Sequence, residues 1–362
     1  MTQFIPVYQT TLSGNESKYV NACLDTGWIS SKGEFVGRFE HSFAQFIQGG
    51  YATSVCNGTV ALHLALHALG IGKGDEVIAP TLTYIASLNA IAYVGATPVL
   101  VDSDPQSWNL DVSQIEAKIT KNTKAVMAVH LYGAVCDMAS LQRICTKHGL
   151  LLIEDAAEAF GSQYHAQFVG TFGDMATFSF FGNKTITTGE GGMVVSKDRG
   201  LLQRAAYFKS QAVSPAREYW HDDIGFNYRM TSICAAIGLA QLEQAESIIE
   251  KKRAIASWYM QELDGLPLAF QLEQAGTRHT YWMVSVLTED QSTRDRLRAS
   301  LKAAGVETRP LFHPAHVMPV FQSSEVFPVA ENLSHRGMNL PSFHTLTQEQ
   351  VRFICDHIKT KF

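Results

Sequence analysis

The stretch FSFFGNKTITTGEGG, residues 178–192, decides how the rest of the sequence is interpreted. An apolar, strand-like run leads into Lys184, and the glycine-rich segment 189–192 follows. Glycines accept positive φ angles, so such a segment can turn closely around a ligand. An unprotonated lysine amine can bond covalently to an aldehyde. Most lysines are solvated surface side chains, however, so this stretch indicates a covalent site only if other parts of the sequence support it.

Asn57-Gly58-Thr59 lies between an expected strand and an expected helix, and it forms the second part of the pattern. The first amides of a helix point outward and carry a partial positive charge, which suits a phosphate. Gly58 allows a close approach of the backbone, the Thr59 hydroxyl adds a donor, and Ser179 could reach the same phosphate. The ordinary alternative is a simple helix cap.

Glu154-Asp155 follows the fully apolar run 150–153, and Asp155 thus stands at the position where α/β sheets place ligand-contacting groups. A buried carboxylate is costly unless it is paired, and a protonated pyridine nitrogen is a suitable partner. The alternative role is again a cap for the following helix. Each of the three parts is ambiguous alone, but their order and their places on strands and helices make the combination specific.

Short strands and helices alternate from residue 51 onward, which predicts a parallel sheet covered on both faces. A long helix over 231–252, continuing to 263, is expected to link a large domain to a smaller α/β domain, which begins near residue 265 with a strand at 281–287. The expected strands of the large domain are 52–56, 76–79, 97–101, 125–129, 150–153, 175–180 and 192–195, and its helices include 60–69, 83–92, 113–119 and 140–148.

Composition excludes several other classes of protein. The formal net charge is −5 and no basic stretch stands out, which argues against a nucleic-acid-binding protein. The longest apolar runs fall short of a membrane span, and we expect no secretory signal at residues 1–9. The six cysteines are scattered without a Cys-x-x-Cys pair, so we expect free thiols in a reducing compartment and no metal site.

The three parts resemble those of the sugar aminotransferases within the aspartate aminotransferase (fold type I) superfamily of pyridoxal 5′-phosphate (PLP) enzymes. The similarity runs over almost the whole chain. It includes LDTGWISS (24–31), GDEVI (74–78), GAVCDM (133–138), GTFGD (170–174), NYRM (227–230), YWHD (219–222) and RGMNLPS (336–342). The resemblance implies an α/β fold with a large PLP-binding domain, residues 1–250, built on a mostly parallel seven-stranded sheet. A smaller C-terminal α/β domain, residues 251–362, would follow.

The resemblance also implies cofactor roles for matched residues. Lys184 would carry PLP covalently and act as the catalytic amine, with Asp155 as the partner of the pyridine nitrogen. Gly58, Thr59 and Ser179 would hold the phosphate, Tyr84 would stack on the ring, and Asn227 would reach the phosphate of the neighbouring subunit. A homodimer with shared active sites is therefore expected.

A second group of matched residues is expected near the sugar substrate. Ser30 matches a segment near the sugar or diphosphate, and Glu158 replaces a His or Gln of many relatives, so it is expected to face the sugar instead. RPLFHPAH (309–316) is either a flap that brings Arg309, His313 and His316 to the sugar or an ordinary proline-bounded loop.

The implied reaction moves an amino group from glutamate to C4 of a nucleotide-linked 4-keto-6-deoxy sugar in the cytoplasm. GDP-4-keto-6-deoxymannose is the favoured substrate and dTDP-4-keto-6-deoxyglucose the alternative. A PLP-dependent dehydratase of the same fold commonly replaces the lysine by His, which Lys184 disfavours. A non-enzymatic, DNA-binding regulator is disfavoured by the net charge of −5 and by the intact Lys184, Asp155 and Thr59.

Overall fold

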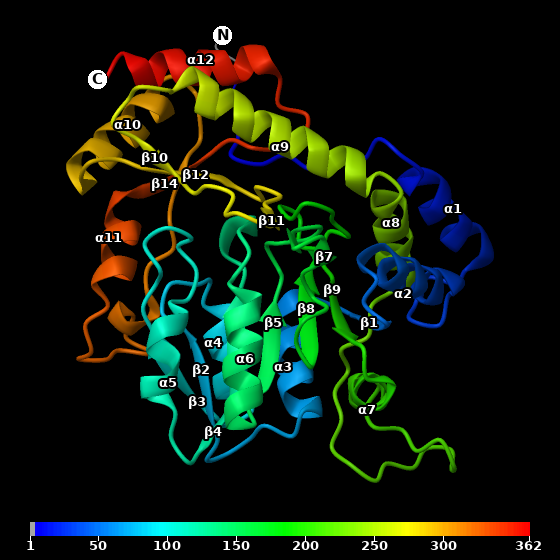
Figure 1. The fold of residues 1–362 in the computed structure, drawn as a ribbon. Coiled ribbons are helices and arrows are strands. Elements are labelled where there is room, and N and C mark those ends of the chain that lie inside the picture. Colours follow the sequence, from blue (N-terminus) through cyan, green and yellow to red (C-terminus); the bar gives the residue numbers. More distant parts are fainter. Residues whose placement is uncertain (1–3) are drawn as a thin grey trace.

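The computed structural model describes residues 4–362, and a seven-stranded sheet lies at its centre (Figure 1). The strand order is β1-β9-β8-β5-β4-β2-β3, in which β9 runs antiparallel to both neighbours and the other pairs are parallel. The strands are β1 (Tyr51–Val55), β2 (Glu76–Pro80), β3 (Thr97–Val101), β4 (Thr123–Val129), β5 (Leu151–Asp155), β8 (Met175–Ser179) and β9 (Gly192–Ser196). The expected mostly parallel sheet of seven strands is confirmed.

Helices cover both faces of this sheet because alternate side chains of each strand point to opposite sides. Val77 and Ala79 of β2 enter one apolar cluster, whereas Ile78 enters another. The first face packs α3 (Gly58–Ala68), α4 (Ala86–Tyr93) and α7 (Arg199–Lys209), and the second packs α2 (Glu34–Ile47), α6 (Met138–His148) and α8 (Ser232–Leu242). Helices α1 (Glu16–Thr26) and α5 (Ile115–Lys118) and the single turns η1 (Val112–Gln114) and η2 (Leu131–Gly133) complete this part.

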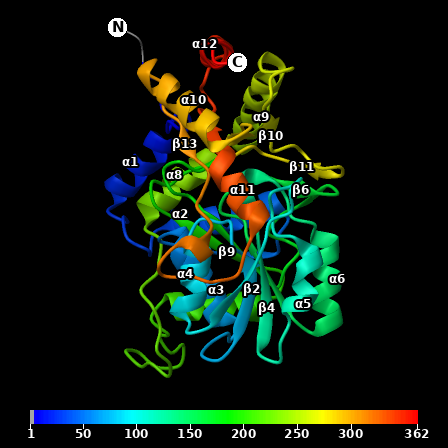
Figure 2. The same cartoon turned by 90° about the vertical axis from the view of Figure 1, so that its left-hand side faces the viewer.

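The C-terminal third forms a second α/β layer above the carboxyl ends of the parallel strands (Figure 2). Its sheet has the order β10-β12-β14-β13 and its own apolar cluster. The elements are α9 (Ala245–Glu262), β10 (Ala269–Phe270), β12 (Val284–Leu287), α10 (Gln291–Ala303), β13 (Arg309–Pro310), η3 (Ala315–Val317), α11 (Pro328–Arg336), β14 (Gly337–Leu340) and α12 (Gln348–Lys359). A small sheet of β11 (Thr277–Arg278), β6 (Gln163–Tyr164) and β7 (Gln167–Phe168) lies between the two layers.

Helix α9 contributes to both cores. Ile249 packs into the cluster of the large sheet, while Ile255 and Tyr259 pack into the C-terminal cluster. The predicted boundary between residues 250 and 251 falls inside this helix and stays a prediction. The structure fits the expectation of a helix that links the two parts.

The N-terminal segment 5–11 crosses from the C-terminal part to the large sheet. Ile5 forms a parallel bridge with Val306, and the amide of Val7 donates to Glu307 at 3.0 Å. Farther along, the hydroxyl of Thr10 donates to the carbonyl of Gly182, 2.8 Å away and two residues before Lys184. The segment therefore joins the C-terminal core to the loop that carries Lys184.

The expected single helix over 231–263 is wrong, because the helix breaks at Glu243 and Gln244. The Glu243 carboxylate accepts hydrogen bonds from Tyr19 at 2.6 Å and Asn15 at 2.7 Å, which ties the break to the start of α1. Neither Gly nor Pro marks the position. Hydrogen bonds from a distant part of the chain thus accompany the break, and the hydrophobic periodicity of 231–263 gives no sign of them.

Two other elements begin at later residues than expected. The helix expected from residue 83 begins at Ala86, and the strand expected from residue 281 begins at Val284. Tyr281 has a φ of 48°, which is incompatible with an extended strand. Within the described residues, no helix is long and apolar enough to cross a membrane.

Candidate active site

Lys184 lies in the loop after β8, and its side chain is 13% exposed. Its Nζ atom is 3.7 Å from Oε1 of Glu158 and 3.8 Å from the centre of the Trp282 ring. Burial lowers the pKa of this amine, and the carboxylates of Glu158 and Asp155 act in the opposite direction. A lysine with a lowered pKa supplies the neutral amine that covalent chemistry requires.

Glu158 lies in the segment after β5 and is 6% exposed. Its Oε2 atom accepts the amide of Tyr132 at 2.8 Å. Burial raises the pKa of Glu158 to about 7, although the charge of Lys184 acts against this rise. The predicted contact with the sugar stays a prediction, and the structure adds a neighbour that the sequence did not indicate, the amine of Lys184.

Asp155 stands at the carboxyl end of β5 and is 4% exposed. One oxygen accepts the hydroxyl of Ser87 at 2.7 Å and the other accepts the amide of Ala157 at 3.1 Å. Both donors are uncharged, and they fix the direction of the carboxylate. A buried carboxylate held in this way is suited to a cationic partner beside it.

Gly58, Thr59 and Ser179 meet at the start of α3. A Cβ added to Gly58 would lie 2.8 Å from Cβ of Ser179, so only glycine permits this approach of helix and strand. Asn57 caps the helix by accepting the amide of Val60 at 3.0 Å. The helix itself leaves the amides of Gly58 and Thr59 for another acceptor, because its first amides have no partner inside it.

An aromatic series extends from the flap segment toward Lys184. The ring of Phe312 lies 5.6 Å from that of Tyr84 and 5.1 Å from that of Tyr132, and Tyr132 lies 6.1 Å from Trp282. Tyr84 itself is 57% exposed on the segment before α4.

Ser30 and Asn227 lie in other parts of this chain. Ser30 is exposed in the segment between α1 and α2, where its carbonyl accepts the amide of Ser232. Asn227 pairs with Ser210 beside α7 and accepts a hydrogen bond from Arg229 at 3.1 Å. Their predicted roles toward a neighbouring subunit or a diphosphate stay predictions.

The three candidate residues of the segment 309–316 lie in different environments. Arg309 is exposed on β13 and lies 5.5 Å from the ring of Tyr8, while His313 is exposed at the tip. His316 is only 4% exposed, and its ring nitrogens lie 2.8 Å from Thr81 Oγ1 and 3.1 Å from Glu331 Oε1. Both nitrogens of His316 are thus engaged within the chain, and its expected contact with the sugar stays a prediction.

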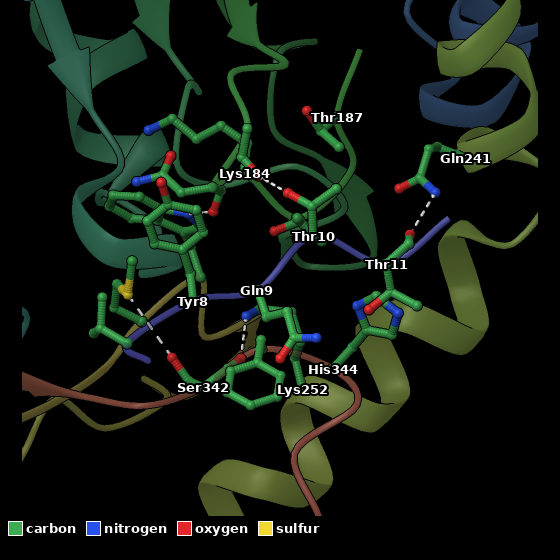
Figure 3. A pocket seen from close by; sticks show the side chains of 17 residues that line it. Tyr8, Gln9, Thr10, Thr11, Lys184, Thr187, Gln241, Lys252, Ser342 and His344 are labelled. Atoms are coloured by element: carbon green, nitrogen blue, oxygen red, sulfur yellow. Dashed lines mark hydrogen bonds between the residues drawn. The ribbon is translucent and has the colours of Figure 1, made fainter. Parts of the chain in front are cut away.

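Three residues around Lys184 were not singled out from the sequence. Trp282 and Tyr132 belong to runs that otherwise suggest core strands and turns, and only the positive φ of 57° at Tyr132 is unusual. Lys252, on α9, lines the same pocket as Lys184 and Thr10, as Figure 3 shows. Sequence gives no signal for them because their proximity arises from the packing of distant segments.

The residues present fit the cofactor that the resemblance implies. Lys184 offers a buried amine, Asp155 a fixed carboxylate, and the start of α3 the amides of Gly58 and Thr59. These groups match an aldehyde, a protonated ring nitrogen and a phosphate, respectively.

Comparisons with known proteins agree with this arrangement. Residues 10–359 match the model of the DegT/DnrJ/EryC1/StrS aminotransferase family. The chain is 57% identical to a GDP-perosamine synthase of Escherichia coli O157:H7, over 98% of each chain, and 50% identical to one of Vibrio cholerae, over 99% of each.

A sugar aminotransferase structure from Streptococcus pneumoniae, solved in its PLP-form, superposes with a TM-score of 0.93. It is 26% identical and covers 99% of this chain and 98% of its own. The chain therefore belongs to the DegT/DnrJ/EryC1/StrS aminotransferase family and is a PLP-dependent sugar aminotransferase.

Proposed function

We propose that the protein transfers an amino group from glutamate to C4 of GDP-4-keto-6-deoxymannose and so forms GDP-perosamine. The likeness to two GDP-perosamine synthases over nearly the full length of the chain carries this proposal. PLP, when bound, supplies the electron-withdrawing ring that lets an amino group pass between two carbonyl compounds. The protein supplies position, protons and exclusion of water.

Lys184 Nζ is proposed to hold the cofactor and to move the proton during transfer. Its burial supports this role, because the lowered pKa keeps the neutral amine accessible. Asp155 is proposed to keep the ring nitrogen protonated, with Ser87 fixing the carboxylate. Gly58, Thr59 and Ser179 would bind the phosphate and Tyr84 would stack on the ring.

The sugar nucleotide is proposed to bind beside Glu158 and under the flap segment. Arg309 and His313 are exposed there and can supply donors, and Ser30 is proposed to contact the diphosphate. Binding far from the reacting carbon helps to hold C4 in place for the chemical step.

We further propose a cytoplasmic homodimer in which Asn227 of each subunit completes the phosphate site of the other. The resemblance to relatives with shared active sites supports this assembly. An amino sugar carried on GDP is an activated unit for polysaccharide synthesis, so we propose the O-antigen of lipopolysaccharide as its destination.

The test compares kcat/KM for GDP-linked and dTDP-linked 4-keto-6-deoxy sugars at one glutamate concentration. We expect the GDP sugar to be preferred. A preference of about tenfold for the dTDP sugar, roughly 1.4 kcal/mol in transition-state binding, would contradict the nucleotide and leave the aminotransferase intact. Turnover of a 3-keto sugar, with none of either 4-keto sugar, would contradict both the position of amination and GDP-perosamine as the product.

A further inference from the structure

The amine of Lys184 is surrounded by two groups that attract a cation. Its Nζ atom lies 3.8 Å from the centre of the Trp282 ring, well inside the range of about 6 Å over which an aromatic face attracts an ammonium group. On the carboxylate side, Glu158 Oε1 is 3.7 Å away. We call the indole face and this carboxylate the amine seat.

The indole of the amine seat is fixed in place. Trp282 is 5% exposed, and its Nε1–H donates to the carbonyl of Asn183 at 2.8 Å. Asn183 directly precedes Lys184, so this bond ties the indole to the backbone of the lysine itself. The ring of Tyr132 lies nearly parallel to the indole, at an angle of 15°.

The carboxylate of the amine seat is fixed by the same tyrosine. The amide of Tyr132 donates to Glu158, and its left-handed backbone, with a φ of 57°, is strained for a residue other than glycine. The phenol oxygen of Tyr132 accepts the amide of Phe312 at 2.9 Å. Tyr132 therefore connects the flap segment to the carboxylate beside Lys184.

We propose that Trp282 and Glu158 form a resting site for the free Lys184 amine and set its position and proton occupancy while it is not bonded to the cofactor. Trp282 is then a positioning residue, because it acts through Lys184. This inference rests on the role proposed above for Lys184, and it adds a reason for Glu158 to be a carboxylate.

The charged and titratable groups that face Lys184 determine the sign of each expected effect. Glu158 and Asp155 are the carboxylates, the buried phenol of Tyr132 lies beyond Glu158, and Lys252 is a second amine in the lining of the same pocket. The indole face and the Glu158 charge both favour the ammonium form. Removing either one lowers the pKa of Lys184, so a larger share of the amine is neutral at a given pH.

The experiment uses the holoenzyme loaded with pyridoxamine phosphate, in which Lys184 is free. Cyanate reacts with neutral amines, and peptide mass spectrometry measures the rate at Lys184. We expect Trp282→Leu and Glu158→Gln to accelerate carbamylation about threefold to tenfold at a pH above 7, where Glu158 is ionised, chosen so that the wild-type lysine is still mostly protonated. Trp282→Phe keeps an aromatic face and should stay near the wild-type rate.

Lys209 is the internal control, because it is buried and bonded to Glu40 at 2.9 Å. Unchanged rates at Lys184 in Trp282→Leu and Glu158→Gln would overturn the proposal. Parallel acceleration at Lys209 would also overturn it, because general loosening would then explain the change.

The assay needs no sugar nucleotide, so failure of the proposed substrate leaves its result intact. A borohydride-reduced cofactor adduct on another lysine would remove the role of Lys184, and the inference with it.

Discussion

Two carboxylates and one amine share a buried region around Lys184. Asp155 and Glu158 are 4% and 6% exposed, and only the amine of Lys184 is a cation among these three. In the proposed arrangement, a protonated ring nitrogen beside Asp155 would supply a second cation. Each of the two carboxylates would then be balanced by a positive charge.

Replacement of Asp155 by Asn tests this balance. The substitution keeps the shape but removes the charge that holds a proton on the ring nitrogen, so we expect turnover to fall by several powers of ten. PLP binding, followed by visible absorbance, should be retained because the phosphate site is separate. Ser87→Ala removes one hydrogen bond but keeps the charge, and should cost much less. Near-normal turnover in Asp155→Asn would exclude its role as the partner of the ring.

Among single residues, the sequence indicated those that lie at or after the ends of strands and helices. Asp155 ends β5, Gly58 begins α3, and Lys184 lies in the loop between β8 and the glycine-rich segment 189–192, where composition and periodicity are informative. Trp282 and Tyr132 were missed because their contacts with Lys184 and Glu158 come from tertiary packing. Residue types inside an ordinary apolar run do not reveal which neighbour they will meet.

Helix α9 carries an unusual side chain in its interior, Lys252. Its residue is 5% exposed, and Nζ donates to the carbonyl of Ser342 at 2.6 Å. Burial lowers the pKa of Lys252 to about 7. In the unfolded chain the pKa of Lys252 keeps its ordinary, higher value, so above pH 7 the unfolded chain binds more protons than the folded chain. The free energy of unfolding therefore rises as the pH goes from 7 toward 10.

We therefore expect Lys252→Met to raise the melting temperature by roughly 2–4 °C at pH 6, where the lysine is charged and its burial costs most. The gain should shrink as the pH approaches 10, because the wild-type amine is then neutral in the folded protein. Lys209→Met leaves the carboxylate of Glu40 without its cationic partner and should instead destabilise the protein. Equal destabilisation by the two substitutions, measured by thermal unfolding, would contradict the expectation for Lys252.

Helices and strands with clear boundaries were predictable from periodicity, as β3 at Thr97–Val101 shows. The break between α8 and α9 was not, because its hydrogen bonds come from Tyr19 and Asn15 at the other end of the chain. The strand expected from residue 281 failed in the same way, since the positive φ of Tyr281 is not encoded by an apolar run.

For the whole molecule, the alternation of elements predicted the parallel sheet, and the resemblance predicted its seven strands and the cofactor. The resemblance alone also supplied the homodimer. The expected role of Asn227 toward the neighbouring subunit stays a prediction. A two-fold dimer would use the same surface on both subunits.

Mixing two inactive variants tests the shared site. A Lys184→Ala subunit retains Asn227, and an Asn227→Ala subunit retains Lys184, so one of the two sites in a hybrid is intact. Random exchange of subunits makes half of the dimers hybrids, and one of the two sites in each hybrid is intact. About a quarter of the wild-type activity should therefore return. Mixing Lys184→Ala with Asp155→Asn should restore none, because both defects belong to the same half of the site. Equal recovery in the two mixtures, or a monomer in light scattering, would contradict the assembly.

The N-terminal segment 5–11 has a consequence for how the protein is made. Ile5 pairs with Val306 and Val7 with Glu307, so these early residues leave the ribosome about 300 residues before their partners do. Translation adds about 5–20 residues per second, so the segment waits many seconds without its native contacts. Thr10 of the same segment bonds to the loop of Lys184, so the segment can join this loop to the C-terminal core only after residues 306 and 307 have been made.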